Sequence, residues 1–348
     1  MCKVNRREFL ATSTAFLSIA AEAELLHGKP VAAAAEAVKA DQVAPDVYFH
    51  EGSLTDNAPA VCNNGWIIFE DYVLVVDANY PAGARLMISK IRALTHKPIR
   101  FAFDTHHHGD HAYGNQVYVE AGAVPVAHTG VIDEMRRKEP RNWEEDLKYR
   151  SDLKDTKLKG PSVLFPKELY FDDGKRRVEL MHLGVAHTHG DAVAWLPKEK
   201  ILFTGDVCVN GPYNFVGDGN VGKWIATLNA AKKLGATTIC TGHGPRSVVS
   251  VLDDQQAFFQ VLQDQVHARL LNSSAEEAKA RVEEIRKTMQ ANPRIARYVS
   301  DGGKDDGFPS QVHKVYEELS GNKLTAFADF GHVARRTHAH SHGAQAAS

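Results

Sequence analysis

Histidine and aspartate residues crowd one short segment of the chain, His106-His107-His108-Gly109-Asp110-His111. Imidazole is the commonest metal ligand in proteins, and a carboxylate beside it suits zinc. The segment follows an apolar stretch, Ile99–Phe103, that predicts a β-strand. Because alternate residues leaving a strand point the same way, we expect His106 and His108 to bind one ion. The turn that follows would carry Asp110 and His111 toward a second ion.

Three later segments repeat this arrangement of a ligand-type residue just past an apolar run. The segments are His187-Thr188-His189-Gly190-Asp191 after Val178–Leu183, Asp206 after Ile201–Thr204, and His243 after Thr237–Thr241. Open α/β sheets place their sites at such strand ends, and the neighbouring glycines permit tight turns. A polar loop with chance histidines explains one segment but not four in this order. The sequence therefore predicts a metal centre.

Other polar and aromatic residues near these segments have less definite roles. His107 is expected to face away from the ions, and His128 and His182 are expected to be structural. His189 is either an orienting donor or exposed, whereas Asp191 is the better candidate to orient a ligand histidine through its free ring N–H. Residues that would line the mouth of the site or pack within the protein are Tyr213, Asn214 and Trp224.

The elements around the predicted site form a pattern that occurs twice. Hairpins are predicted at Trp66–Phe69 with Val73–Val76 and at Leu169–Phe171 with Val178–Leu183. In each half the hairpin is followed by elements in the order strand, helix, strand. Helices are predicted over Ala82–Leu94 and Lys223–Leu234, and a further strand over Ala192–Leu196. This repetition favours two packed sheets with helices outside them.

Beyond about Val251 the spacing of the apolar residues becomes that of helices. Helices are predicted over Asp253–Leu271, Ala275–Gln290 and Gln311–Leu319, as an extension that packs on the core or on a second copy of the chain. A histidine-rich tail ends the sequence, and we expect it to be a solvated, disordered tail rather than a metal site. The predicted organisation is 1–40 export signal and linker, 41–250 catalytic domain, 251–330 helical extension and 331–348 tail.

The H-x-H-x-D-H motif at His106–His111, followed in order by His187, Asp206 and His243, resembles the signature of the metallo-β-lactamase superfamily. The resemblance extends from about Val43 to Val251. The resemblance implies an α+β fold, a four-layer αββα sandwich. It also implies two Zn²⁺ ions per chain, with Fe or Mn as alternatives because their ligand types overlap. By this resemblance the first ion is bound by His106, His108 and His187, the second by Asp110, His111 and His243, and Asp206 bridges both. With an aspartate at position 206, the chain resembles the glyoxalase II, lactonase and related hydrolase branches. The lactamases with a cysteine ligand would have cysteine at this position.

The chemistry implied by this resemblance is hydrolysis of a carbonyl compound by a metal-bound hydroxide, with Asp110 orienting the nucleophile. The substrate would be a small molecule such as a β-lactam, a lactone or another ester or amide. Alternatives are a thioester hydrolase of the glyoxalase II type, an iron persulfide dioxygenase or di-iron oxidoreductase of the same fold, and a non-catalytic metal-binding protein.

Charge and the N-terminal residues bear on partners and location. The 348 residues carry a formal net charge of −2 and only four cysteines, without a C-x-x-C pair, which argues against a nucleic-acid partner and a disulfide framework. Arg6-Arg7-Glu8-Phe9-Leu10 before a short apolar run resembles a twin-arginine signal and predicts export by that machinery to the periplasm or beyond. The alternative is a fraying helix of a cytoplasmic protein.

Overall fold

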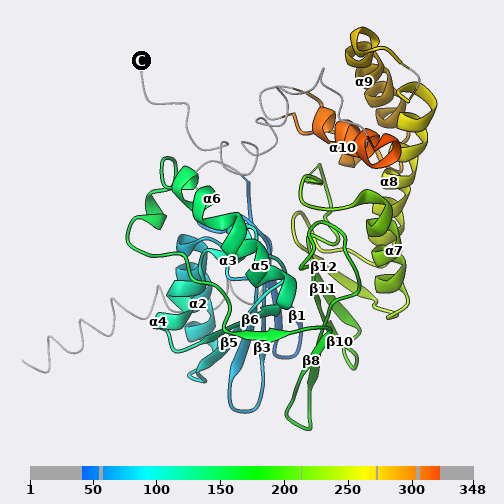
Figure 1. Ribbon diagram of the computed structural model, residues 1–348. Helices are drawn as coiled ribbons and strands as arrows, with labels where there is room; N and C mark the ends of the chain where they lie inside the picture. Colours follow the sequence, from blue (N-terminus) through cyan, green and yellow to red (C-terminus); the bar gives the residue numbers. More distant parts are fainter. Residues whose placement is uncertain (1–40, 55–57, 213, 272, 303–305, 322–348) are drawn as a thin grey trace, which may run out of the picture.

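Two β-sheets pack face to face, and helices cover the outer face of each sheet (Figure 1). The computed structural model describes residues 41–54, 58–212, 214–271, 273–302 and 306–321. The predicted four-layer αββα sandwich is confirmed. The expected export signal and the histidine-rich tail lie outside the described residues, and the predicted domain boundaries stay predictions.

The first sheet has seven strands in sequence order. Its first four strands are antiparallel neighbours and the remaining pairings are parallel. The strands are β1 (Gln42–Ala44), β2 (Val47–His50), β3 (Asn64–Ile68), β4 (Val73–Val76), β5 (Ile99–Asp104), β6 (Val124–His128) and β7 (Val163–Phe165).

The second sheet has five strands in the order β12-β11-β10-β9-β8, in which only β11 and β12 are parallel. Its strands are β8 (Glu168–Asp172), β9 (Arg177–Met181), β10 (Val193–Leu196), β11 (Ile201–Gly205) and β12 (Thr238–Thr241). Both predicted hairpins are present, as β3–β4 and β8–β9.

Alternation of apolar side chains along the strands explains the layers. In β4, Leu74 and Val76 point into the core between the sheets, whereas Val73 and Val75 pack against the outer helices. The helices beside the first sheet are α2 (Pro81–Leu94), α3 (Gly109–Ala112), α4 (Asn115–Glu120), α5 (Thr129–Arg137), α6 (Glu139–Asp146) and the short η1 (Ser151–Leu153). A strand that is apolar on both faces must be covered on both, which is what the four layers provide.

The second sheet is covered by α7 (Val221–Lys232) and by the predicted C-terminal extension, which is also confirmed. The extension consists of α8 (Ser250–Arg269), α9 (Ala275–Gln290), η2 (Ala296–Tyr298) and α10 (Phe308–Ser320). These helices lie beside α7, on the same side of the second sheet (Figure 1). Their buried side chains share one apolar cluster with the outer face of the sheet, so the extension continues the core. Within the described part of the chain, no helix combines the length and apolar character needed to span a bilayer.

Candidate metal centre

The predicted ligand segments meet at one edge of the sandwich, where strands of both sheets end. His106 and His108 follow β5, and α3 then carries Asp110 and His111. From the second sheet, His187 lies in the loop after β9, while Asp206 and His243 follow β11 and β12. All seven side chains are buried except that of His108, which is 12% exposed.

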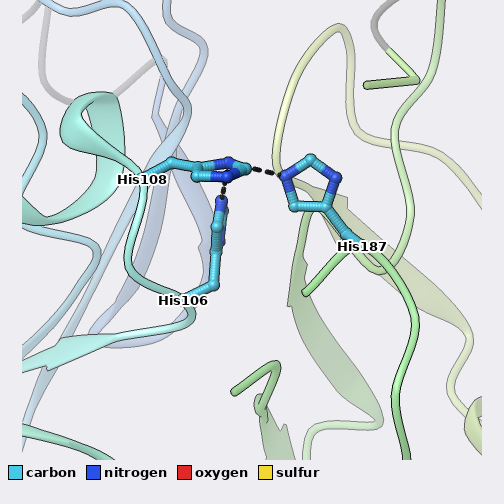
Figure 2. A group of neighbouring side chains, drawn as sticks. All are labelled: His106, His108 and His187. Carbon is cyan, nitrogen blue, oxygen red and sulfur yellow. Dashed lines mark hydrogen bonds between the residues drawn. The ribbon is translucent and has the colours of Figure 1, made fainter. Parts of the chain in front are cut away.

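Three imidazole nitrogens converge at the first site, defined by His106, His108 and His187 (Figure 2). The Nδ1 atom of His108 lies 2.8 Å from Nε2 of His187 and 3.2 Å from Nε2 of His106. Nitrogen ligands of a tetrahedral ion with bonds of about 2.0–2.1 Å lie roughly 3.3 Å apart. The spacing of these donors therefore fits a metal ion.

The second site is formed by Asp110, His111 and His243, whose ligand atoms lie within 4.8 Å of one another. Nε2 of His243 is 3.2 Å from Oδ2 of Asp110 and 3.4 Å from Nε2 of His111. Two imidazoles and a carboxylate are a donor set that suits a divalent ion of the zinc type.

Asp206 lies between the two sites. Its Oδ1 atom is 3.3 Å from Nε2 of His111, and its Oδ2 atom is 3.4 Å from Nε2 of His187 and 3.5 Å from Nε2 of His243. One carboxylate thus faces histidines of both sites, which is the position that a bridging ligand requires.

In three of the ligand histidines, the ring nitrogen that faces away from the site has a partner of its own. The Asp218 carboxylate accepts from Nε2 of His108 at 3.0 Å, and the Phe215 carbonyl accepts from Nδ1 of His187 at 2.8 Å. Asp77 accepts from Nδ1 of His111 at 2.9 Å. Such partners fix the tautomer and direction of a ligand ring.

Burial and charge set the protonation of these groups. Burial, reinforced by the surrounding histidines, holds the pKa of His106 well below its usual value, so this ring is neutral and offers a lone pair. Burial alone would raise the pKa of Asp206, but His243 and His111 outweigh it, and the pKa lies below its usual range. The carboxylate is therefore ionised.

A buried thiol also lies near the second site. Burial raises the pKa of the Cys62 thiol to about 12, so this thiol stays protonated beside Asp77 and His111.

The structure also locates the less certain histidines and Asp191. The His107 ring is buried, with Nε2 3.6 Å from Asp218 and 3.7 Å from Glu139, away from the converging nitrogens. His189 is exposed, while His128 and His182 stack on each other 4.1 Å apart. The expected role of Asp191 is corrected: its carboxylate accepts from the backbone and hydroxyl of Thr188, and so shapes the loop of His187 rather than orienting a ring directly.

Trp224 and Asn214 do not line the mouth of the site; the alternative expectation, that they pack within the protein, is the one the structure shows. Trp224 is fully buried, donates from Nε1 to the Val207 carbonyl and packs against Phe259, because its indole completes the apolar layer beneath His187. Asn214 is 2% exposed, so its side chain is buried rather than open to solvent. Tyr213 lies outside the described residues.

Three contributors to the site were missed in the sequence. Asp77 directly follows the strand Val73–Val76, so the rule that located Asp206 applies to it as well. Asp218 and the Phe215 carbonyl lie in the irregular loop between β11 and α7, where periodicity carries no signal.

Comparisons with known proteins identify the fold and the family. The model of the "Metallo-beta-lactamase superfamily" matches residues 58–243, more than half of the chain. A metallo-beta-lactamase from Pontibacter korlensis is similar in structure, with a TM-score of 0.53 and 17% identity, over 63% of this chain and 97% of that one. The DIM-1 metallo-beta-lactamase exposed to ceftazidime and the TMB-1 structure each give a TM-score of 0.51 at 17% identity. Each alignment covers 63% of this chain, with 94% of DIM-1 and 95% of TMB-1. The likeness to these structures shows the fold, and the match to the family model shows that this chain belongs to the metallo-β-lactamase superfamily.

Proposed function

We propose that this protein is a metal-dependent hydrolase of the Asp-bridged dinuclear type, with two Zn²⁺ ions per chain. The observation that carries the proposal is the position of Asp206, whose two oxygens lie 3.3–3.5 Å from histidine nitrogens of both sites. Superfamily membership supports it, since most of its members are hydrolytic enzymes.

Hydrolysis here would depend on the ions and on a small number of side chains. Two ions held by these residues would lower the pKa of a bound water molecule and polarise a carbonyl group. Asp110, whose Oδ2 lies 3.2 Å from Nε2 of His243, would orient the attacking water and could accept a proton from it. The described cysteines are all buried, and burial raises the pKa of each thiol. None of them is therefore suited to act as a nucleophile.

The substrate we propose is a small molecule with a β-lactam, lactone or other ester or amide bond, hydrolysed outside the cytoplasm after twin-arginine export. The residues Arg6-Arg7-Glu8-Phe9-Leu10 support the export. A glyoxalase-like thioester is the alternative substrate, and it would place the reaction inside the cell.

Metal analysis and one substitution test the proposal together. Purified protein lacking residues 331–348 should contain two zinc ions per chain and hydrolyse at least one member of a panel of β-lactams, lactones and thioesters. Asp206→Ala should abolish hydrolysis and lower the occupancy of the second site, because the bridging carboxylate is lost. Full activity of Asp206→Ala with a single ion would refute the bridging role. A single iron in the wild-type protein would favour a dioxygenase, and absence of bound metal would favour a non-catalytic protein.

A further inference from the structure

One irregular loop orients two of the three histidines of the first site. This loop joins β11 to α7, and its Phe215 carbonyl and Asp218 carboxylate are the partners of His187 and His108 at 2.8 and 3.0 Å. The directions of both rings therefore depend on where the loop lies.

The C-terminal helix α10 contacts this loop through polar residues on one of its faces. Gln311, Lys314 and Glu318 are spaced three and four residues apart, which places them on the same side of the helix. Nε2 of Gln311 donates to the Asn214 carbonyl at 2.6 Å, and Nζ of Lys314 lies 3.5 Å from the Gly217 carbonyl. These two contacts fall directly before Phe215 and Asp218.

The third contact fixes the end of the loop. The Glu318 carboxylate accepts from the backbone N–H of Val221 at 2.9 and 3.0 Å and from that of Gly222 at 3.4 Å. These groups belong to the first turn of α7, where helical N–H groups lack partners within the helix and a negative charge is favourable. Glu318 thus holds the point at which the loop becomes a helix.

Helix α10 is itself firmly placed. Its apolar residues Phe308, Val312 and Val315 are buried in the cluster that contains α7 and α8. The helix also lies beyond residues 58–243, the segment that matches the superfamily model.

We propose that α10 is a positioning element of the metal centre, in which Gln311, Lys314 and Glu318 hold the loop so that His187 and His108 face one ion. This inference rests on the proposed metal centre, and it concerns the first site alone. At the second site, His111 is oriented by Asp77 at the end of β4, and Asn63 donates to the Gly244 carbonyl beside His243 at 2.8 Å. Neither residue belongs to α10.

The test compares three variants of the full chain. Glu318→Ala removes the contact to α7, and Glu318→Gln keeps an acceptor oxygen. Glu317→Ala is the matched control, because the carboxylate of Glu317 faces His313 on its own helix at 3.5 Å. In protein stripped of metal by a chelator, amide hydrogen exchange of Val221 and Gly222 should accelerate in Glu318→Ala and recover in part in Glu318→Gln. It should be unchanged in Glu317→Ala.

Zinc titration against a competing chelator provides the second readout. Affinity for one of the two ions should fall in Glu318→Ala, by no more than the roughly 10–100-fold that loss of a direct orienting partner costs, because Glu318 acts on the rings through the loop. The Asp77→Asn substitution lowers the affinity of the second site. Adding Glu318→Ala to that variant should also lower the affinity for the other ion, at the first site.

Thermal unfolding confirms that each variant is folded. Unchanged exchange and affinity in folded Glu318→Ala, or equal effects in Glu317→Ala, would overturn the inference. If zinc affinity falls as expected but no compound of the panel is hydrolysed, the proposed function fails and the positioning role stands.

Discussion

Each histidine ligand can offer only one ring nitrogen to an ion, so the partner of the other nitrogen decides how the ring is presented. His108 turns Nδ1 toward the first site because Asp218 accepts from its Nε2, whereas His187 turns Nε2 because the Phe215 carbonyl accepts from its Nδ1. The Thr105 hydroxyl lies 3.1 Å from Nδ1 of His106, which leaves Nε2 of that ring for the same site.

Asp77 should matter to the second site without being a ligand. Its Oδ2 accepts from Nδ1 of His111 at 2.9 Å, and its Oδ1 accepts from the Thr105 N–H at 2.8 Å. Asp77→Asn should weaken binding of one zinc ion about 10–100-fold, because an amide replaces the carboxylate that fixes the His111 tautomer. Competitive zinc titration measures this.

Asp46→Asn is the matched control for that substitution. Asp46 has the same left-handed backbone, φ 61° against 64° at Asp77, but it is exposed and lies in the turn between β1 and β2. An equal loss of affinity in both variants would mean that the effect is not due to His111.

At the scale of elements, the turns after the strands bring the ligands together. The loop after β12 passes so close to the end of β11 that a Cβ atom on Gly242 would overlap Oδ1 of Asp206 and lie 2.6 Å from the Gly205 carbonyl carbon. Only glycine allows His243 and Asp206 to approach each other in this way.

Gly242→Ala should therefore displace Asp206 and abolish binding of at least one ion, as measured by zinc content after dialysis. Gly307→Ala serves as the control, since φ at Gly307 is −80° and a Cβ atom there has open space. Retention of two tightly bound ions in Gly242→Ala would contradict the close approach of the two loops.

At the scale of the molecule, the centre lies between two halves that each supply part of it. His106, His108, Asp110 and His111 come from the first sheet, and His187, Asp206 and His243 from the second. Asn63 reinforces this junction, since its backbone N–H donates to the Gly242 carbonyl at 2.9 Å and its side chain to that of Thr241 at 2.8 Å.

Bound ions should consequently stabilise the whole sandwich. Binding to the folded state alone stabilises it by about 4 kcal/mol for one site at a free ion concentration 1,000 times the Kd. Removal of metal by a chelator should lower the Tm measured by calorimetry, and added Zn²⁺ should restore it. A Tm independent of metal would show that the ions do not link the two halves.

Protonation of Asp146, at the end of α6, should make the free energy of unfolding depend on pH. Burial, opposed by the hydrogen bond from the Tyr80 hydroxyl, raises the pKa of Asp146 to about 7 from an ordinary value of 3.8. A raised carboxyl pKa means that the folded state holds a proton that the unfolded state has released. Stability is therefore lost as the pH rises from about 4 to about 7.

Asp146→Asn removes this term, because the amide carries no charge at any of these pH values. Relative to wild type, the variant should gain stability from pH 5 to pH 8 by at most roughly 2–3 kcal/mol, measured by urea unfolding. Asp133→Asn, on an exposed face of α5, is the control. A gain of equal size at both pH values would contradict the raised pKa.

Much of this architecture follows from local patterns. The hairpins β3–β4 and β8–β9 and the helices α2, α7, α8, α9 and α10 were predicted, because apolar residues at a period of two or near 3.6 determine which face is buried. The elements between Asn115 and Phe165 were not predicted. Of the two strands there, β6 contains Pro125 and β7 has only three residues, so neither gives a clear strand signal.

The sequence alone also identified the ligand types, because histidine and aspartate next to glycine at strand ends are a local signal. Only the tertiary structure decided their partners: Asp77, Asp218 and the Phe215 carbonyl are separated from the rings they orient by 28 to 110 positions of chain. It also placed Trp224 in the core and set α10 against the loop of the first site. A hydrogen bond between distant segments depends on how the sheets and helices pack, and no local pattern in the chain records that packing.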